Sequence, residues 1–408
     1  MELEQEGMIN AVPRELRLIL MLLRSPHHPS WLTDVERLVA EEIDWNFFIE
    51  LTQRHRIYPT LERVIRENAT LLPLEATAAI KKLCMTNVFQ MLQLTSELDR
   101  INRIFEENHV RALSLKGPGL AYLLHGDISQ RTSKDLDILV PIVDFERAEA
   151  LLLQAGYKVD GDGPRILNEW KYKRRNDAYY HPEKGIQIEL HWRLYANLGK
   201  EPTFEELWTR KKTVTFSNMQ VHILNQEDLF FYLVIHGAKH AWFRLRWLED
   251  IARLINLGFD WERTLRMFET YHCSQLAGQA LIMTSDLFGT PLTASMRRLT
   301  LTPKSKALAR ETLPFINAEI SVEGSRQFNR YWYHMLSHRH KWAYLKRLLY
   351  PSFMDAQTLP LPRRLHFLYF PFRPFLWLWR RFNGMISHEA QSRKQRAARG
   401  DDVRYVNQ

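Results

Sequence analysis

The chain of 408 residues is 45% hydrophobic and 25% charged, which excludes a disordered or fibrous protein and suffices for two or three domains with cores of their own. Its two cysteines, Cys84 and Cys273, lie far apart, so no disulfide framework is expected and a reducing cytoplasm is indicated. The net charge of +9 is concentrated near one end. Residues 326–408 hold sixteen Lys and Arg against four acids, a balance of +12, which leaves −3 on residues 1–325. Nucleic acid is therefore not expected as a partner, because affinity for it depends largely on neutralising phosphates.

Neither a signal peptide nor a membrane span is expected. The first ten residues, MELEQEGMIN, are acidic and lack a basic segment followed by an apolar one. No run of about 18 uninterrupted apolar residues occurs in the sequence. We therefore expect a soluble, cytoplasmic protein.

Residues 1–105 are predicted to form a helical N-terminal domain. Apolar residues recur at three- and four-residue spacing from position 14 onward, and again in a long segment from Leu74 to Asn108. Asp44 is a suitable N-cap for the helix that follows it. The polar run QRHR at 53–56 is interpreted as a solvated helix end rather than as a site.

The apolar pattern changes in residues 106–215, which we expect to form an α+β core. Strands are predicted at Val110–Leu115, Asp135–Val140, Tyr157–Val159, Ala178–His181 and Ile186–Trp192, and helices at Leu120–His125 and Asp144–Ala155. Strand, helix, strand, helix and hairpin in this order indicate a small mixed sheet with helices packed on it.

Residues 203–325 are predicted to be helical, with 216–325 forming a domain that supplies the other wall of a cleft. If Glu227–Gly258 is one helix, a single face holds His236, Lys239, His240, Phe243, Trp247 and Asp250. A face that mixes charge with aromatic rings is more typical of a cleft than of a dry core. His236 and His240 lack the glutamate of the HExxH zinc motif. A cleft face where the histidines, Lys239 and Asp250 contact substrate or pair with one another is therefore preferred to a metal site.

Residues 326–408 form a basic, aromatic C-terminal segment, and from Ser387 onward a disordered tail is predicted. Aromatic residues and arginines in 360–408 suit peripheral attachment to an anionic membrane at its inner face. They equally suit a protein partner or nucleic acid, and packing against the body of the protein with a solvated basic rim is also open.

Two carboxylates stand out in the core. Asp135 and Asp137 are two residues apart on a predicted strand, so they point to the same face. Adjacent anions repel unless a cation lies between them, and a divalent metal ion is the usual solution. Glu189 completes an acidic cluster if its strand is a neighbour, and His191 shares its face.

The pattern Lys116-Gly117, then Asp135-Leu136-Asp137, then Glu189 resembles the nucleotidyltransferase superfamily. More narrowly, LSLKG, an Arg shortly before DLDILV, IELHW and HGAKHAWFRLRWLEDI resemble a largely uncharacterised bacterial family of nucleotidyltransferase-like proteins. The resemblance covers most of residues 40–260. It implies a nucleotidyltransferase-type mixed sheet flanked by mainly α-helical N- and C-terminal domains. It also implies Mg²⁺-dependent transfer of a nucleotidyl group from a nucleoside triphosphate such as ATP to a hydroxyl or phosphate acceptor.

By this resemblance, Asp135, Asp137 and Glu189 are the catalytic residues and the metal ligands. The predicted nucleotide- and acceptor-binding residues are Lys116, Gly117, Arg131, His191, His236, Lys239, His240 and Asp250. Pro118 stands where the wider superfamily has Ser or Gly, which removes a phosphate donor. The acceptor class implied is a small molecule, a glycan or a peptide, with polysaccharide biosynthesis as one context. The alternative is a catalytically silent nucleotide-binding regulator or scaffold of a biosynthetic, membrane-associated pathway.

Overall fold

The structure, a computed structural model, describes residues 7–24, 31–68, 71–160, 169–195, 199–320, 322 and 324–382. The chain divides into two compact units: unit 1 is residues 1–160 and 176–341, and unit 2 is residues 161–175 and 342–408. The predicted domain boundaries after residues 105, 215 and 325 all fall inside unit 1, and that finer division stays a prediction.

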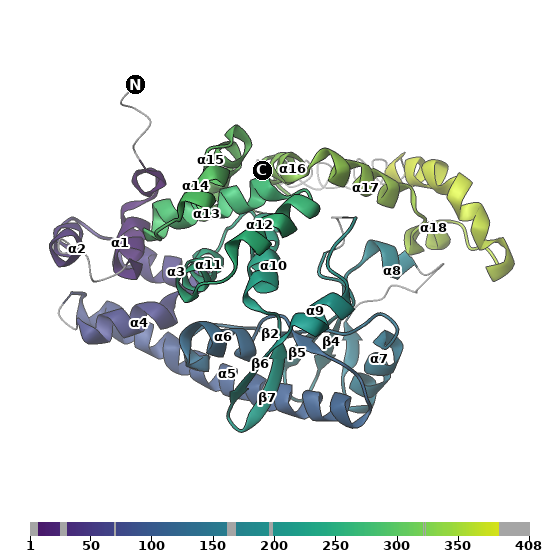
Figure 1. The fold of residues 1–408 in the computed structure, drawn as a ribbon, viewed down its shortest axis with the longest axis horizontal. Coiled ribbons are helices and arrows are strands. Elements are labelled where there is room, and N and C mark those ends of the chain that lie inside the picture. Colours follow the sequence, from purple (N-terminus) through teal and green to yellow (C-terminus); the bar gives the residue numbers. More distant parts are fainter. Residues whose placement is uncertain are drawn as a thin grey trace, which may run out of the picture. The chain divides into compact units, whose positions relative to one another are not determined.

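A seven-stranded mixed sheet lies at the centre of unit 1, in the order β3-β4-β5-β2-β1-β7-β6 (Figure 1). Its strands are β1 (Leu113–Ser114), β2 (Asp135–Leu139), β3 (Lys158–Asp160), β4 (Asn176–His181), β5 (Ile186–His191), β6 (Lys212–Phe216) and β7 (Met219–Ile223). Strand β2 is parallel to β5 on one side and antiparallel to β1 on the other. The predicted α+β fold class, with helical segments before and after the sheet, is confirmed.

Strands β6 and β7 show that the prediction of an entirely helical segment over 203–325 was wrong. They form an antiparallel hairpin whose turn residues, Ser217 and Asn218, have φ values of 50° and 60°. Such left-handed turn residues match the twist of paired strands. The alternation of buried and exposed residues in KTVTF and MQVHI is the signal that could have identified both strands.

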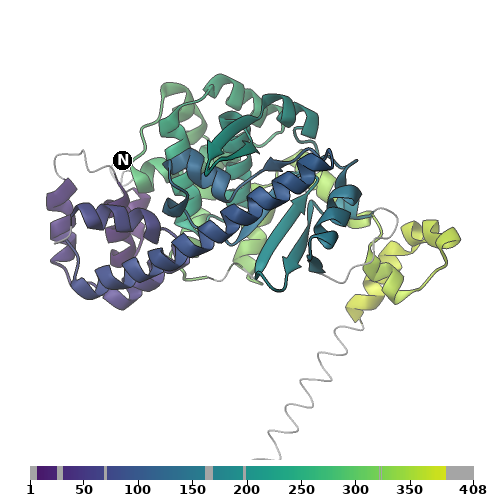
Figure 2. The same ribbon diagram turned by 90° about the horizontal axis from the view of Figure 1, so that it is seen from below.

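Five helices precede the sheet: α1 (Arg14–Leu23), α2 (Trp31–Val39), α3 (Trp45–His55), α4 (Tyr58–Glu67) and α5 (Leu74–Glu107). The Asp44 carboxylate accepts the backbone N–H groups of Asn46 and Phe47, each at 3.0 Å, which confirms the predicted N-cap of α3. Helix α5 is 34 residues long and runs across unit 1, packing on α4 and on β2 (Figure 2).

Between and after the strands, unit 1 contains α6 (Pro118–His125), η2 (Ile128–Gln130), α7 (Phe145–Gln154), α9 (Phe204–Arg210), α10 (Gln226–Lys239), α11 (Leu245–Leu257), α12 (Trp261–Thr270), α13 (Ser274–Phe288), α14 (Ala294–Thr300), α15 (Pro303–Ile316) and α16 (Arg326–Met335). The short helix η1 (Met8–Ala11) packs on α13 and α15. Helix α17 (His338–Leu349) continues along the chain from unit 1 into unit 2.

The segment Glu227–Gly258 is two helices rather than one. Ala241 and Trp242, at φ 49° and 53°, reverse the chain between α10 and α11. The Trp242 ring then lies against Gly237, where a Cβ atom would come within 2.2 Å of it. The single face expected from a continuous helix is therefore wrong: His236, Lys239 and His240 belong to the end of α10, whereas Trp247 and Asp250 belong to α11.

Unit 2 contains α8 (Glu169–Lys173), α18 (Phe353–Thr358), η3 (Arg363–Leu368) and a helical stretch over residues 369–382. The disordered tail predicted from Ser387 lies outside the described residues. Across the part of the chain that the structure describes, every helix is too short or too polar to cross a membrane.

Candidate active site

An acidic cluster forms where β2 and β5 pair. The two strands are neighbours, as the prediction required, and their register sets Asp137 beside Glu189. One side-chain ligand atom from each of Asp137, Glu189 and His191 lies within 4.8 Å of the others. The His191 Nε2 atom is 3.2 Å from Asp137 Oδ1 and 3.3 Å from Glu189 Oε2, and the Lys116 Nζ atom is 3.0 Å from the same Asp137 oxygen. These four side chains are called the acidic cluster below.

The pKa values of the carboxyl groups in and beside this cluster are shifted in different directions. Burial disfavours the charged form of Asp137, yet the Lys116 ammonium and the His191 imidazole hold the pKa of its carboxyl well below the usual range. Asp135, half-buried at the start of β2, has its pKa raised by burial and then by the charge of Asp137. Burial also disfavours ionised Glu189, but its hydrogen bond with His191 leaves the pKa of Glu189 lowered.

The donor set of the acidic cluster fits a divalent metal ion. The buried Asp137 Oδ2 atom has no hydrogen-bond partner among the described residues, and Glu189 is the residue paired with Asp137 on the neighbouring strand. Carboxylate oxygens suit Mg²⁺ and Mn²⁺, and an imidazole nitrogen adds a preference for transition metals. The structure thus groups Asp137 and Glu189 with His191, whereas Asp135 lies two residues away along β2 and outside this group.

Gly117 and Pro118 begin helix α6. Gly117 has φ 76° and ψ −146°, a conformation that favours glycine, and it is the N-cap residue of α6. Pro118 occupies the first helical position, where its missing N–H would have had no partner within the helix. Pro118 therefore does not distort the turn that sets Lys116 beside Asp137.

Arg131 and Asp250, both predicted to bind ligand, bind each other. The Arg131 Nε and Nη2 atoms donate to the two Asp250 oxygens at 2.8 and 2.9 Å, and both side chains are 2% exposed. Arg246 lies one turn before Asp250 on α11. Its Nη1 atom donates to the Thr132 hydroxyl at 2.8 Å and also to the Thr132 carbonyl. These bonds fix the segment that leads into β2 against α11, so the pair holds the position of Asp135 and Asp137.

An arginine cluster, defined by Arg56, Arg244 and Arg246, is the part of the site that sequence reasoning missed. Burial, and then the charges of Arg56 and Arg54, lower the pKa of Arg244 to about 10. The pKa of Arg246 is also lowered, by burial and then by the charge of Arg131. The negative charge of Asp135, by contrast, acts to raise the pKa values of Arg56 and Arg244. The positive charges of these three side chains thus oppose one another, and the charge of Asp135 at the start of β2 offsets part of this repulsion.

A buried histidine joins the two segments that carry Arg56 and Arg244. His55 is fully buried at the end of α3, and its Nδ1 atom accepts the backbone N–H of Leu245 at 3.2 Å. Burial and the charges of Arg54 and Arg244 lower the pKa of His55 to about 3, so the ring is neutral at physiological pH. This contact joins the end of α3 to the start of α11. The interpretation of residues 53–56 as a solvated helix end is therefore wrong for His55.

His236 and His240 lie in an aromatic cluster instead of the acidic one. Their rings are 4.9 Å apart and are 5.4 and 5.3 Å from the ring of Trp247. The Trp247 ring is 5.0 Å from that of Phe243, and the Arg244 guanidinium carbon is 4.8 Å from the Phe243 ring centre. The aromatic cluster therefore adjoins the arginine cluster through Arg244. Lys239, half-buried, ends the same helix, α10.

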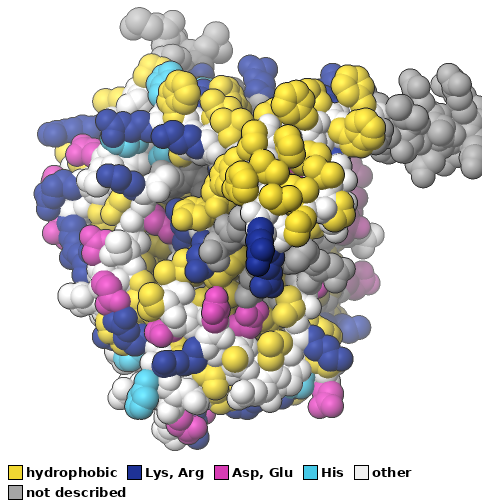
Figure 3. Space-filling model, turned by 90° about the vertical axis from the view of Figure 1, so that its right-hand side faces the viewer, with side chains coloured by type: hydrophobic (Ala, Val, Ile, Leu, Met, Phe, Trp, Pro, Cys, Tyr) yellow, Lys and Arg dark blue, Asp and Glu magenta, His cyan; other side chains and the backbone are white. Residues whose placement is uncertain are grey.

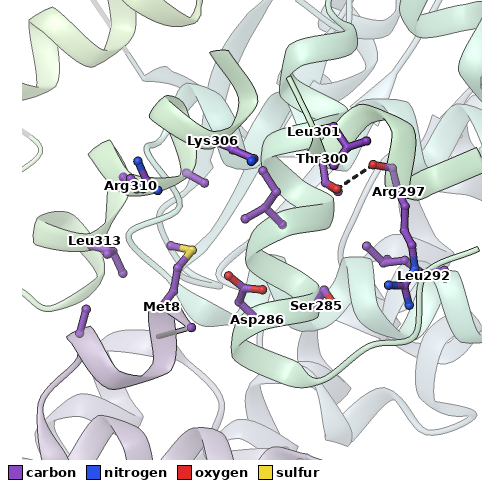
Figure 4. A pocket seen from close by; sticks show the side chains of 14 residues that line it. Met8, Ser285, Asp286, Leu292, Arg297, Thr300, Leu301, Lys306, Arg310 and Leu313 are labelled. Carbon is purple, nitrogen blue, oxygen red and sulfur yellow. Dashed lines mark hydrogen bonds between the residues drawn. The ribbon is translucent and has the colours of Figure 1, made fainter. Parts of the chain in front are cut away.

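A cavity of about 770 Å³ lies elsewhere in unit 1, lined by residues of η1, α13, α14 and α15 (Figure 4). Lys306, Arg310 and Asp286 are among its lining residues, but none of the predicted site residues is. The candidate active site is the acidic cluster, because its carboxylates and imidazole are grouped closely enough to hold a metal ion.

Comparison with known proteins decides the family. A family model described as "Uncharacterised nucleotidyltransferase" matches residues 41–289, more than half of the chain. The chain belongs to this family. The matched range contains the acidic, arginine and aromatic clusters, and the predicted nucleotidyltransferase family is thereby confirmed.

The remaining comparisons do not refine the assignment to this family. No curated protein matches the chain. A crystal structure of an antigenic nucleotidyltransferase-like protein from Paracoccidioides brasiliensis is 14% identical, with a TM-score of 0.32. The match covers 50% of this chain and 95% of that one. A TM-score this low carries no weight for the fold or the activity.

Proposed function

We propose that this nucleotidyltransferase transfers a nucleotidyl group from a nucleoside triphosphate to a hydroxyl or phosphate acceptor in a Mg²⁺-dependent reaction. The observation that supports the proposal is the meeting of two oppositely charged clusters at one strand. The acidic cluster lies along β2 and β5, and the arginine cluster interacts electrostatically with Asp135 where β2 begins. A triphosphate complexed with a divalent cation carries the complementary arrangement of charge.

Asp137, Glu189 and His191 would hold the metal ion, with Asp135 as a further ligand once the site is filled. A bound metal ion supplies charge that offsets the repulsion between these carboxylates and the α-phosphate. Lys116, which already neutralises Asp137, gives a positive charge beside the same oxygen. Glu189, the most exposed of the three carboxylate and imidazole ligands at 23%, is proposed to accept the proton of the acceptor hydroxyl.

Arg56 and Arg244 are proposed to bind the β- and γ-phosphates. A guanidinium group donates two parallel hydrogen bonds to a phosphate, and its charge stabilises the pyrophosphate that leaves. Arg131 and Asp250 then act by positioning β2 rather than by touching the nucleotide. The proposed acceptor wall is formed by His236, Lys239 and His240 together with the aromatic cluster. The side chains of this wall would determine whether a small molecule, a glycan or a peptide binds as the acceptor.

The second candidate, a catalytically silent nucleotide-binding regulator, is favoured by one observation. The Lys116 ammonium already lies 3.0 Å from Asp137 Oδ1, where a metal ion would also bind. An internal cation at this point lets the protein fold and bind nucleotide without a metal ion.

The test mixes the purified full chain with Mg²⁺ and each of the four nucleoside triphosphates, and follows binding by calorimetry and pyrophosphate release with a panel of acceptors. The matched variant is Asp137→Asn, which keeps the shape of the side chain. Binding and release by the parent, with release lost in the variant, is the expected result. Absence of binding by every triphosphate would overturn the proposal. Binding without release from any acceptor would favour the silent regulator.

A further inference from the structure

Unit 2 buries its carboxylates. Asp355 is fully buried, and its Oδ1 atom pairs with Arg373 and Arg380, each at 2.7 Å. Glu169 is 5% exposed and accepts the backbone N–H of Phe353 at 3.1 Å. These are the two acids in the described part of unit 2, which also holds eleven Lys and Arg. The charge that this part of the unit presents to its surroundings is therefore positive.

Unit 2 also exposes its large apolar side chains. In the helical stretch 369–382, the least exposed positions are Tyr369, Arg373, Leu376 and Arg380, which recur at helical spacing on one stripe. The side chains around the rest of the helix are exposed: Phe370, Phe372, Phe375, Trp377, Leu378, Trp379 and Phe382. Phe375 is 70% exposed and Trp379 is 63% exposed. This part of the unit thus has an ionic interior and an aromatic exterior.

Neighbouring segments of unit 2 add to this exterior. Trp342, Leu345, Leu348 and Leu349 on α17, and Phe367 on η3, are also exposed. Together with the seven residues of 369–382 they are called the aromatic surface. Figure 3 shows a broad gathering of hydrophobic side chains on one face of the molecule, with Lys and Arg side chains beside it. An exposed apolar patch of this kind marks an interaction site.

We infer that the aromatic surface binds the interface of an anionic lipid bilayer. Trp, Phe and Leu insert at the boundary between headgroups and acyl chains, and adjacent Lys and Arg are attracted by anionic headgroups. Exposed cations stand next to these rings: Arg363, Arg364 and Arg381 are exposed, and the Arg381 guanidinium carbon is 5.4 Å from the Trp377 ring centre. Since the helices described are too short or too polar to span a bilayer, the attachment is to the membrane surface.

Two other partners, a second copy of the chain and single-stranded nucleic acid, fit the aromatic surface less well. A second copy of the chain would bring two positive surfaces together, and the charges would repel. Single-stranded nucleic acid binds by stacking bases on a few aromatic rings, and the exposed leucines of α17 offer no ring for stacking and no group for hydrogen bonding. Burial in a bilayer interface accounts for the aliphatic and aromatic members of the surface alike.

The experiment is flotation of the full chain with vesicles of phosphatidylcholine alone, or of phosphatidylcholine with about a third phosphatidylglycerol, at low and high salt. The test variant replaces Phe375, Trp377 and Trp379 with Ala. The matched control replaces Phe89 and Leu92, which are 67% and 53% exposed on α5 in unit 1, with Ala. Thermal unfolding of each variant checks that the chain is folded. A second variant, Arg363→Glu with Arg364→Glu, tests the charge without touching the rings.

We expect the parent and the α5 control to float with anionic vesicles and not with neutral ones. The aromatic variant should bind anionic vesicles at least tenfold more weakly, and the charge-reversal variant should lose its preference for them. Equal flotation of the parent and the aromatic variant would overturn the inference, as would binding to neutral vesicles that matches binding to anionic ones. Retention of a single-stranded RNA by the parent, with no flotation, would assign the surface to nucleic acid instead.

Discussion

The acidic and arginine clusters adjoin at β2 but differ in how their charge is compensated. In the acidic cluster, Asp137 is paired with Lys116 and hydrogen-bonded to His191. In the arginine cluster, the charge of Asp135 acts on both Arg56 and Arg244, and the repulsion from Arg56 contributes to lowering the pKa of Arg244 to about 10. The charge of Asp137 is therefore compensated within the acidic cluster, whereas the arginine cluster carries excess positive charge that an anion would relieve.

The largest effect is expected from Asp137→Asn. The change removes the charge that attracts Lys116 and that would hold the proposed metal ion, so the rate of pyrophosphate release should fall by about a thousandfold or more. Calorimetry with Mn²⁺ should show loss of metal binding to the same variant. Unaltered Mn²⁺ binding would show that the acidic cluster is not the metal site.

The next largest effect is on stability, through Arg131→Ala. Removing one partner of a buried ion pair leaves the other charged and unpaired, which costs about 3–5 kcal/mol in free energy of unfolding. Urea denaturation measures this cost. The double variant Arg131→Met with Asp250→Leu should recover most of it. The control, Arg111→Ala, breaks an exposed pair with Glu205 and should change the unfolding curve little.

Arg244→Ala should weaken binding of nucleoside triphosphate about 10- to 100-fold, which corresponds to about 1.4–2.8 kcal/mol. The same change should leave the thermal midpoint unaltered or raised, because it removes a repulsion. The control is Arg310→Ala, which removes an arginine from the cavity between η1 and α15. A loss of stability in Arg244→Ala without a loss of affinity would show that the cluster has a structural role instead.

The sequence predicted the acidic cluster and missed the arginine cluster for a physical reason. Asp135 and Asp137 share a face because strand geometry has a period of two, and one pairing, β2 with β5, suffices to add Glu189. The arginine cluster needs Arg56 and Arg244, 188 positions apart, to be joined by the contact between His55 and Leu245. No local pattern encodes that contact.

The fold shows the same distinction. Helices α1 and α5 and strands β1 to β5 follow from periodicity, whereas the break between α10 and α11 does not. Apolar periodicity continues through residues 240–244, and the chain reverses because the Trp242 ring packs on Gly237. Tertiary packing thus overrides a local helical pattern at the point that carries Arg244.

The smallest effect concerns a carboxylate outside both clusters. Burial disfavours ionised Glu97, but hydrogen bonds from Arg100, Lys184 and Tyr157 lower its pKa to about 2. The stability that this carboxylate provides is fully present above its ordinary pKa of 4.5 and is lost as pH falls through about 2. Glu97→Gln should cost about 1–2 kcal/mol at pH 7 and flatten the pH dependence of unfolding between those values, without changing nucleotide affinity. An unchanged pH profile would contradict this.

The most direct test of the central claim, that one nucleotide engages both clusters, is a crystal structure with Mn²⁺ and a non-hydrolysable nucleoside triphosphate. The account predicts that an anomalous peak will locate a Mn²⁺ ion coordinated by Asp137 and Glu189. The β- and γ-phosphates should contact Arg56 and Arg244. A nucleotide bound instead in the cavity beside Lys306 and Arg310, with the acidic cluster still closed by Lys116, would contradict it.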